Sequence, residues 1–133
     1  PALFEAWAKT FEGENLADAK ATLDHYNKFI DPVIWDLAER RHYARVVLDR
    51  LAASMGSAGD DLRAAATEFA AIHDLMWKIN RTGGATKPGT RLPKLDDPAV
   101  RKEIAGLIRQ AAAHDATAAD LIEKALKKSK QGN

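Results

Sequence analysis

The residues whose spacing best suits metal chemistry are Glu39 and His42, three positions apart in a segment with helical periodicity. Side chains three apart share one face of a helix and can bind a single ion, as they do in di-metal helical bundles. Such a site needs a second pair, and the nearest candidates, Glu68 and His73, are five residues apart. Their side chains diverge by roughly 140° on a helix. We therefore predict no metal site and interpret Glu39 with His42 as an exposed pair.

Acid–base and nucleophilic catalysis have few candidate residues. The chain has no cysteine, which excludes thiol nucleophiles, disulfides and Cys-ligated metal centres within it. His73 and His114 fall on or beside apolar stripes, where a histidine is more often a hydrogen-bonded core residue than a catalyst. Asp115 follows His114 directly, but neighbours in a helix point about 100° apart, so their contact would be poor. We predict no catalytic residue and no cofactor.

Arg41 stands in the apolar stripe of its segment, where a guanidinium must find a carboxylate or several carbonyl groups. One interpretation is a salt-bridged arginine whose stem covers apolar surface. The other is an arginine held at a pocket to receive an anionic group. The second interpretation places Arg41, His42, Tyr43 and His73 around a ligand pocket between the two helices that carry them.

Residues 81–95 contain three glycines, two prolines, four basic residues and no acid. This composition predicts a long exposed basic loop. The glycine spacing partly matches a phosphate-binding loop, but no lysine follows the second glycine of that pattern and no strand precedes it, so we reject a nucleotide site. The four basic side chains would attract an anionic group or an acidic protein. They are Arg81, Lys87, Arg91 and Lys94.

The scaffold for these residues is predicted to be all-helical, because alanine is abundant and alternating β-branched runs are missing. Asp31-Pro32 and Asp97-Pro98 are typical helix starts, since aspartate caps the free N–H groups and proline has none to leave unpaired. Asn15 and Asp60 are further candidate caps, and Gly13 and Gly56 are candidate ends. We expect an antiparallel bundle of about five helices, over about residues 4–12, 15–30, 31–55, 60–80 and 98–129.

The last predicted helix, over about residues 98–129, is the longest. With a rise of about 1.5 Å per residue, it would be nearly 50 Å long. That length would overhang a compact bundle. Either the helix bends near Ala116 and Thr117, or its far half lies against something outside this chain. We expect residues 130–133 to form a frayed tail.

The bulk properties of the chain exclude some partners. Its 133 residues fit one domain, and 20 Lys and Arg against 19 Asp and Glu leave it close to neutral, so net charge predicts no binding to nucleic acid or membrane. No apolar run approaches the ~18 residues of a membrane span, and the first residues do not resemble a signal peptide. These features predict a single cytoplasmic domain.

Several short pieces of sequence occur in order along residues 35–126. They are Arg41-x-Tyr43-Ala44 with Leu48 downstream, Phe69-x-x-Ile72-x-x-Leu75-x-Trp77, Asp97-Pro98-x-x-Arg101 leading into Ile104, and Leu121-Ile122-x-x-Ala125-Leu126. Together they resemble the helical C-terminal half of the butirosin-biosynthesis protein H-like acyltransferase family. Most of the match is apolar periodicity, and the first and third pieces are the more specific.

The resemblance implies transfer of an acyl group from the phosphopantetheine arm of a carrier protein to an amine. The family is expected to use a papain-like Cys and His in its N-terminal half. This chain has no cysteine and no room for that half, so those catalytic residues cannot be placed on it. The resemblance thus implies a helical module, a fragment, or a subunit whose catalytic partner lies elsewhere, with a carrier protein as one candidate partner.

Two functions remain open from the sequence. The first is a non-catalytic accessory or interaction domain that packs against a protein partner or a second copy, because the last helix is overlong and no catalytic set is complete. The alternative is a small-ligand-binding or enzymatic bundle built around Arg41, His42, Tyr43 and His73. We predict that the isolated chain is not an enzyme.

Overall fold

The computed structural model describes residues 2–12, 19–87 and 91–131, with side-chain surroundings for all of these except 19–31 and 131. This part of the chain contains four helices and no strand, which confirms the all-helical class. The helices are α1 (Ala2–Glu12), α2 (Ala19–Ala52), α3 (Ser57–Thr82) and α4 (Pro98–Gln131). The count differs from the expected five because two predicted helices are one.

The predicted break at Asp31-Pro32 is wrong, because α2 continues through Pro32. A proline inside a helix removes one backbone hydrogen bond. Packing outweighs that loss here, since Ile34 and Ala38 in the next turns are completely buried. The proline itself is exposed. Asn15, the predicted cap of the earlier helix, lies outside the described residues.

The turn between α2 and α3 depends on two glycines. Gly56 has a φ of 50°, in the left-handed region that favours glycine. At Gly59 an added Cβ would lie 2.3 Å from the carbonyl oxygen of Ala52. The backbones of the two helices therefore approach closely, and α3 begins at Ser57, three residues before the predicted cap Asp60.

The predicted start of α4 is confirmed. The Asp97 carboxylate accepts a hydrogen bond from the backbone N–H of Ala99 at 2.8 Å, and Pro98 is the first helical residue. Arg101 then donates to the carbonyl oxygens of Leu95 and Asp96 at 2.8 and 3.0 Å. The Asp-Pro-x-x-Arg piece thus serves here to fasten the loop to the helix.

The helix α4 runs unbroken past Ala116 and Thr117, the position of the bend that was one of the two alternatives. Its second half packs on α3, where Ala118 and Ala125 are buried. The helix also extends to Gln131, which corrects the prediction of a frayed tail from residue 130, and residues 132–133 lie outside the described part. No helix in the described part of the chain, this one included, is both long enough and apolar enough to span a membrane.

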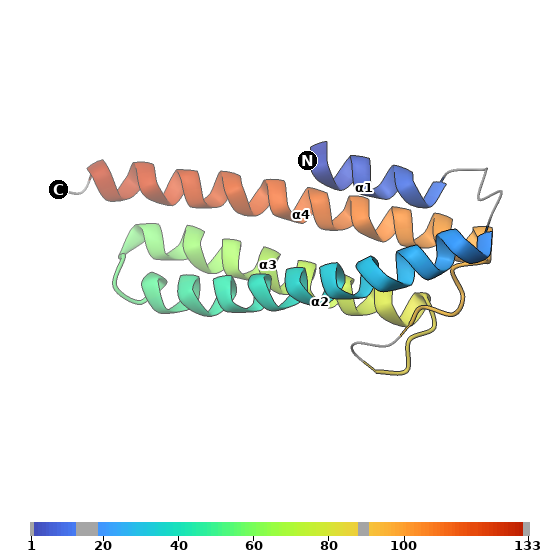
Figure 1. Cartoon of the computed structure of the whole chain (residues 1–133). Helices are drawn as coiled ribbons and strands as arrows, with labels where there is room; N and C mark the ends of the chain where they lie inside the picture. The colour runs from blue at the N-terminus through green and yellow to red at the C-terminus, as the bar shows by residue number, and fades with distance from the viewer. Residues whose placement is uncertain (1, 13–18, 88–90, 132–133) are drawn as a thin grey trace.

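The helices pack in the order α2, α3, α4, α1. The α3 helix contacts both long helices, and α1 contacts α4. Among the described residues no backbone contact joins α1 to α2 or α2 to α4. Figure 1 shows α3 running back along α2, α4 running back along α3, and α1 lying over the N-terminal half of α4. One corner of the bundle is therefore incompletely filled.

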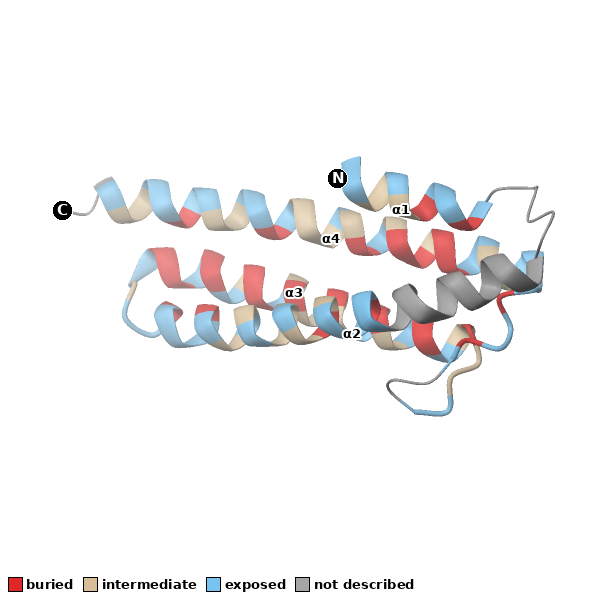
Figure 2. Cartoon of the chain, viewed as in Figure 1, coloured by how far each residue is buried: buried red, intermediate tan, exposed pale blue. Residues whose placement is uncertain are grey.

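The core follows this packing order, with buried faces along α3 and the first half of α4 (Figure 2). Ile72, Met76 and Ile104 are among its completely buried side chains. The loop after α3 adds Leu92 and Leu95, whose exposed fractions are 0% and 1%. The expectation of a wholly exposed loop over 81–95 is corrected by these two leucines, because apolar side chains gain by leaving water.

Replacement of Pro32 tests whether α2 is one helix. We expect Pro32→Ala to raise the free energy of unfolding by about 1–3 kcal/mol, because alanine restores a backbone hydrogen bond inside a helix. Chemical denaturation measures the change. The matched control is Pro98→Ala, at a first helical position where proline costs nothing. Equal and negligible effects at both positions would show that Pro32 also begins a helix.

Candidate functional site

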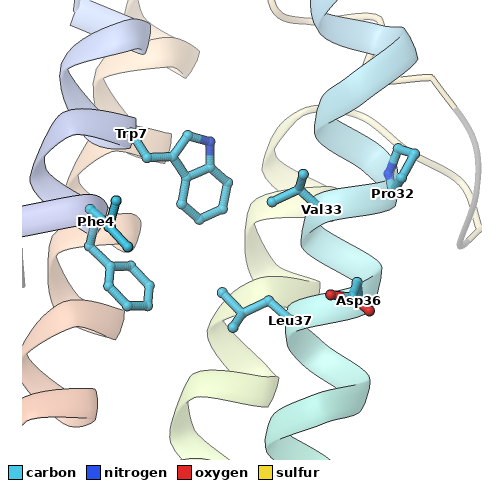
Figure 3. A pocket seen from close by; sticks show the side chains of 7 residues that line it. Phe4, Trp7, Pro32, Val33, Asp36 and Leu37 are labelled. Carbon is cyan, nitrogen blue, oxygen red and sulfur yellow. The ribbon is translucent and has the colours of Figure 1, made fainter.

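An apolar groove of about 440 Å³ lies between α1 and α2, two helices whose backbones are not in contact among the described residues. Figure 3 shows Phe4 and Trp7 of α1 facing Val33 and Leu37 of α2 across a gap. The groove is lined by Leu3, Phe4, Trp7, Pro32, Val33, Asp36 and Leu37. Asp36 is the only charged residue among the described lining residues, and its carboxylate already accepts a hydrogen bond from Arg40 at 2.6 Å.

The α1 wall of the groove is aromatic because Phe4, Trp7 and Phe11 recur at helical spacing. The ring centroids of Phe4 and Trp7 are 6.5 Å apart, and those of Trp7 and Phe11 are 6.4 Å apart, within the range of favourable aromatic pairs. Ala8 and Phe11 are buried, whereas Leu3 is 86% exposed. One face of α1 therefore packs on the bundle while its first turn leaves a leucine in water.

A single arginine of α4 fastens α1 in place. The Arg109 guanidinium donates to Glu5 at 2.9 and 3.0 Å, and to both carboxylate oxygens of Glu12. The two glutamates are seven residues apart, so they lie on one face of α1. Their hydrogen bonds to Arg109 lower the pKa of both Glu5 and Glu12. Charge-assisted forked bonds of this kind fix orientation as well as position.

The helix α1 fills only part of its corner. It has 11 residues against 34 in α4, or roughly 17 Å against 51 Å at 1.5 Å per residue. Beyond its first residue, the space between α2 and the second half of α4 has no fourth helix among the described residues (Figure 1).

Apolar side chains line this uncovered length. On α2, Leu37 faces the groove, and steps of seven residues lead along the same face to Ala44 and Leu51. On α4, Asp115 reaches toward α2, and steps of seven and eleven lead to Ile122 and Leu126.

We call Ala44, Val47, Leu51, Ile122 and Leu126 the open corner. Three of them are large and about half exposed, with values of 54% for Val47, 48% for Leu51 and 53% for Leu126. Exposed apolar side chains that are grouped on one side of a molecule mark interaction sites more often than isolated ones do.

The sequence-predicted residue Arg41 forms a salt bridge with Asp115 of α4, at 2.6 Å. Its guanidinium also lies 5.1 Å from the ring centroid of Phe69, a cation–π distance. Both charged side chains are about three-quarters buried, with 25% and 27% of their surface exposed. This geometry matches the interpretation of Arg41 as a paired arginine that spans from α2 to α4.

The other three predicted ligand-binding residues lie apart from Arg41. The His42 ring lies 5.6 Å from His73 and 5.7 Å from Tyr43, measured between centroids, and Tyr43 is 65% exposed. His73 Nε2 accepts a hydrogen bond from the Trp77 indole at 2.9 Å, so the neutral ring carries its proton on Nδ1, 3.1 Å from Asp74. The structure thus groups His42, Tyr43 and His73, while Arg41 turns to α4.

The expected exposed pair of Glu39 and His42 is not formed, because His42 packs its ring against His73. Within the described ranges, no three His, Cys, Asp or Glu residues are grouped so that they could hold a metal ion. His114 pairs through Nδ1 with Glu68 of α3 at 2.5 Å. Sequence reasoning missed this contact and the Arg109 clamp, because both join residues far apart in the chain.

The structure brings together two of the four predicted anion-attracting residues. Arg81 and Lys87 line a cavity of about 270 Å³ with Trp77, Asn80, Ala85 and Thr86. Arg91 and Lys94 are exposed elsewhere on the loop.

Acidification tests the attachment of α1. The pKa values of Glu5 and Glu12 are lowered in the folded chain, so their contribution is present above the ordinary value of 4.5 and is lost as pH falls below it. We expect α1 to detach at a higher pH than α3 unfolds, as followed by NMR signals of Trp7 and Ile72. Arg109→Gln should give the detached Trp7 signal at neutral pH. Simultaneous loss of both signals would contradict this account.

A double-mutant cycle tests the role of Arg41. Arg41→Met should lower the free energy of unfolding by about 2 kcal/mol, because it leaves Asp115 without its cation, and Asp115→Leu in addition should restore most of the loss. Arg40→Met is the control, since the exposed pair of Arg40 and Asp36 should contribute less than about 0.5 kcal/mol. Unchanged stability in Arg41→Met would instead indicate a charge kept for recognition.

Comparisons of the chain with protein-family models, with curated proteins and with solved structures found no match.

Proposed function

We propose that this chain is a non-catalytic helical interaction domain, and that an amphipathic helix of a protein partner occupies the open corner. The observation that carries the proposal is the difference in length between α1 and its neighbours. Two 34-residue helices, α2 and α4, present apolar side chains toward a corner, and the 11-residue helix α1 covers only about a third of the length of that corner. A partner helix would remove those side chains from water, which is the main driving force of association.

The chemistry of the partner helix follows from α1 and from the rim of the corner. Apolar residues at spacings of three and four would meet α2 and α4, as Phe4 and Trp7 do on α1. Arg50 on the α2 rim and Asp120 on the α4 rim are exposed. Neither forms a salt bridge with a described residue. We therefore expect an acid on one flank of the partner helix and a base on the other.

The partner would complete the architecture. With a long helix in the open corner, the sides of α2 and α4 that face it would be covered along their whole length. The resemblance to the acyltransferase family suggests where to look for the partner, in a carrier protein or a catalytic subunit of an acyl-transfer system. A second copy of this chain is the competing occupant.

A small-ligand function is the second candidate, because the groove between α1 and α2 has a suitable size. Its volume of about 440 Å³ falls in the range of ligand pockets, and its lining would accept an apolar chain such as an acyl group. A ligand there would contact Trp7 and Val33 and would leave Leu51 and Leu126 untouched. The two candidates therefore predict different sensitive positions.

Charge substitution on matched positions of α2 tests the interaction. Leu51 and Trp35 are equally exposed, at 48% and 49%, but only Leu51 lies in the open corner. We expect Leu51→Lys to reduce partner affinity at least tenfold, because a lysine would have to be desolvated at the contact. Trp35→Lys should leave the affinity unchanged. Light scattering on the purified chain first decides whether the partner is a second copy.

The partner is identified by a photoreactive side chain at position 51 in cells of the native host, with position 35 as the control. The expected cross-links map to the apolar face of one helix in one protein. A separate affinity capture with the Leu51→Lys chain, which carries no photoreactive group, should no longer recover that protein. Cross-links of equal yield from both positions, or a partner retained by Leu51→Lys, would refute the proposal.

A further inference from the structure

The groove between α1 and α2 contains one polar group that is available to a ligand, the indole N–H of Trp7. Figure 3 shows the Trp7 ring extending from α1 toward Val33, with its nitrogen on the edge that faces α2. This N–H donates to no described residue, whereas the indole of Trp77 donates to His73. Trp7 is half-buried, and its nitrogen is not one of the buried unpaired atoms of the described residues, so the N–H is accessible.

The charges around the groove disfavour both kinds of ion. None of the described lining residues is a lysine, an arginine or a histidine, so an anion would find no positive partner there. The carboxylate of Asp36 on the rim would repel it. A cation gains little from the same carboxylate, because Asp36 already accepts a hydrogen bond from Arg40. The groove therefore favours an uncharged ligand.

Uncharged ligands differ in what they do to the Trp7 N–H. A hydrocarbon that covers this group removes its water and offers no acceptor, and an unpaired donor costs free energy. A ligand with a carbonyl oxygen at the same place replaces the lost water. The remaining surface is apolar, with the Phe4 ring 6.5 Å from the Trp7 ring between centroids and with Val33 and Leu37 opposite.

We propose that this groove binds an uncharged apolar molecule with one carbonyl group, such as a ketone or an ester, whose oxygen accepts a hydrogen bond from Trp7 Nε1. The volume of about 440 Å³ lies in the range of about 300–1,000 Å³ that is typical of ligand pockets. The inference rests on the second candidate function, the small-ligand groove. It does not involve the partner helix in the open corner.

Such a ligand would also connect α1 to α2, whose backbones are not in contact among the described residues. Its site exists only while α1 is attached, because Phe4 and Trp7 form one wall. A ligand that binds only the attached state stabilises that state in proportion to the logarithm of its concentration. Since acid weakens the attachment through Glu5 and Glu12, the ligand should lower the pH at which α1 detaches.

Four probes of nearly the same shape test the proposal on the whole chain by NMR titration at neutral pH. They are the ketone 4-phenylbutan-2-one, the anion 3-phenylpropionate, the cation 4-phenylbutan-2-amine, and the hydrocarbon butylbenzene. We expect the ketone to bind with a Kd on the order of 1 mM and to move the indole proton of Trp7 downfield. The two ions should bind at least about tenfold more weakly.

A variant tests the hydrogen bond, because Trp7→Phe keeps an aromatic ring but has no N–H. Butylbenzene leaves water more readily than the ketone, so each probe is compared with itself in the two chains. Trp7→Phe should weaken the ketone about fivefold more than butylbenzene. Trp35→Phe, at a half-exposed position outside the groove, should change neither. Arg109→Gln, which releases α1, should abolish the binding of both.

The link to α1 has its own measurement. At about three times its Kd, the ketone should lower the pH of α1 detachment by about 0.3 of a unit, if two carboxylates take up protons on release. The Ala8 amide signal follows detachment without depending on either ring of the groove. A detachment pH that the bound ketone leaves unchanged would show that α1 is not part of the site.

The outcomes separate the carbonyl contact from the groove itself. No saturable binding of the ketone or of butylbenzene would refute the groove as a ligand site. Equal weakening of both by Trp7→Phe would refute the carbonyl contact alone. An indole proton of Trp7 that does not move downfield at saturation has the same meaning, and it needs no variant. Tighter binding of the amine than of the ketone would show that Asp36 is available and would overturn the assignment to uncharged ligands.

Discussion

The packing of two long helices on the same third helix is the constraint on which the rest of this structure depends. The helices α2 and α4 both lie along α3, and among the described residues their backbones do not touch. A helix buries its apolar stripe only where a neighbour covers it. Because α3 covers one side of each long helix, the sides that face the remaining corner depend on α1 or on another molecule.

The short helix α1 meets that need over a limited length and through few contacts. Ala8 and Phe11 are its two buried residues, and Arg109 holds it by Glu5 and Glu12. The Arg109 clamp joins α4 to α1, and the Arg41–Asp115 salt bridge joins α2 to α4. Both hold together helices that bury only part of their apolar surface against each other. The groove and the open corner are consequences of that incomplete coverage, and the interaction function that we propose is its simplest use.

The sequence predicts helices well and contacts between them poorly. Asp97-Pro98 was identified as a helix start and is one, whereas the same signal at Asp31-Pro32 lies inside α2. The two dipeptides are locally alike, and the burial of Ile34 in the core, which the dipeptide does not reveal, favours the interior position at Pro32.

The candidate site shows the same limit. Arg41 stood out because it interrupts an apolar stripe, and it proves to be paired. The more elaborate arginine, Arg109, gave no such signal until α1 was placed beside it. The sequence itself places four basic residues in and beside the loop after α3, but the burial of Asn80 and of the two leucines of the loop follows from packing that no local pattern encodes.

Thiol labelling of the isolated, monomeric chain tests most directly whether the corner is open. The chain has no cysteine, so a single introduced thiol reports on one position alone. Our account predicts that cysteines at positions 51 and 126 react nearly as fast as one at exposed position 43. Slow labelling at 51 and 126, with fast labelling at 43, would show that the chain closes its own corner.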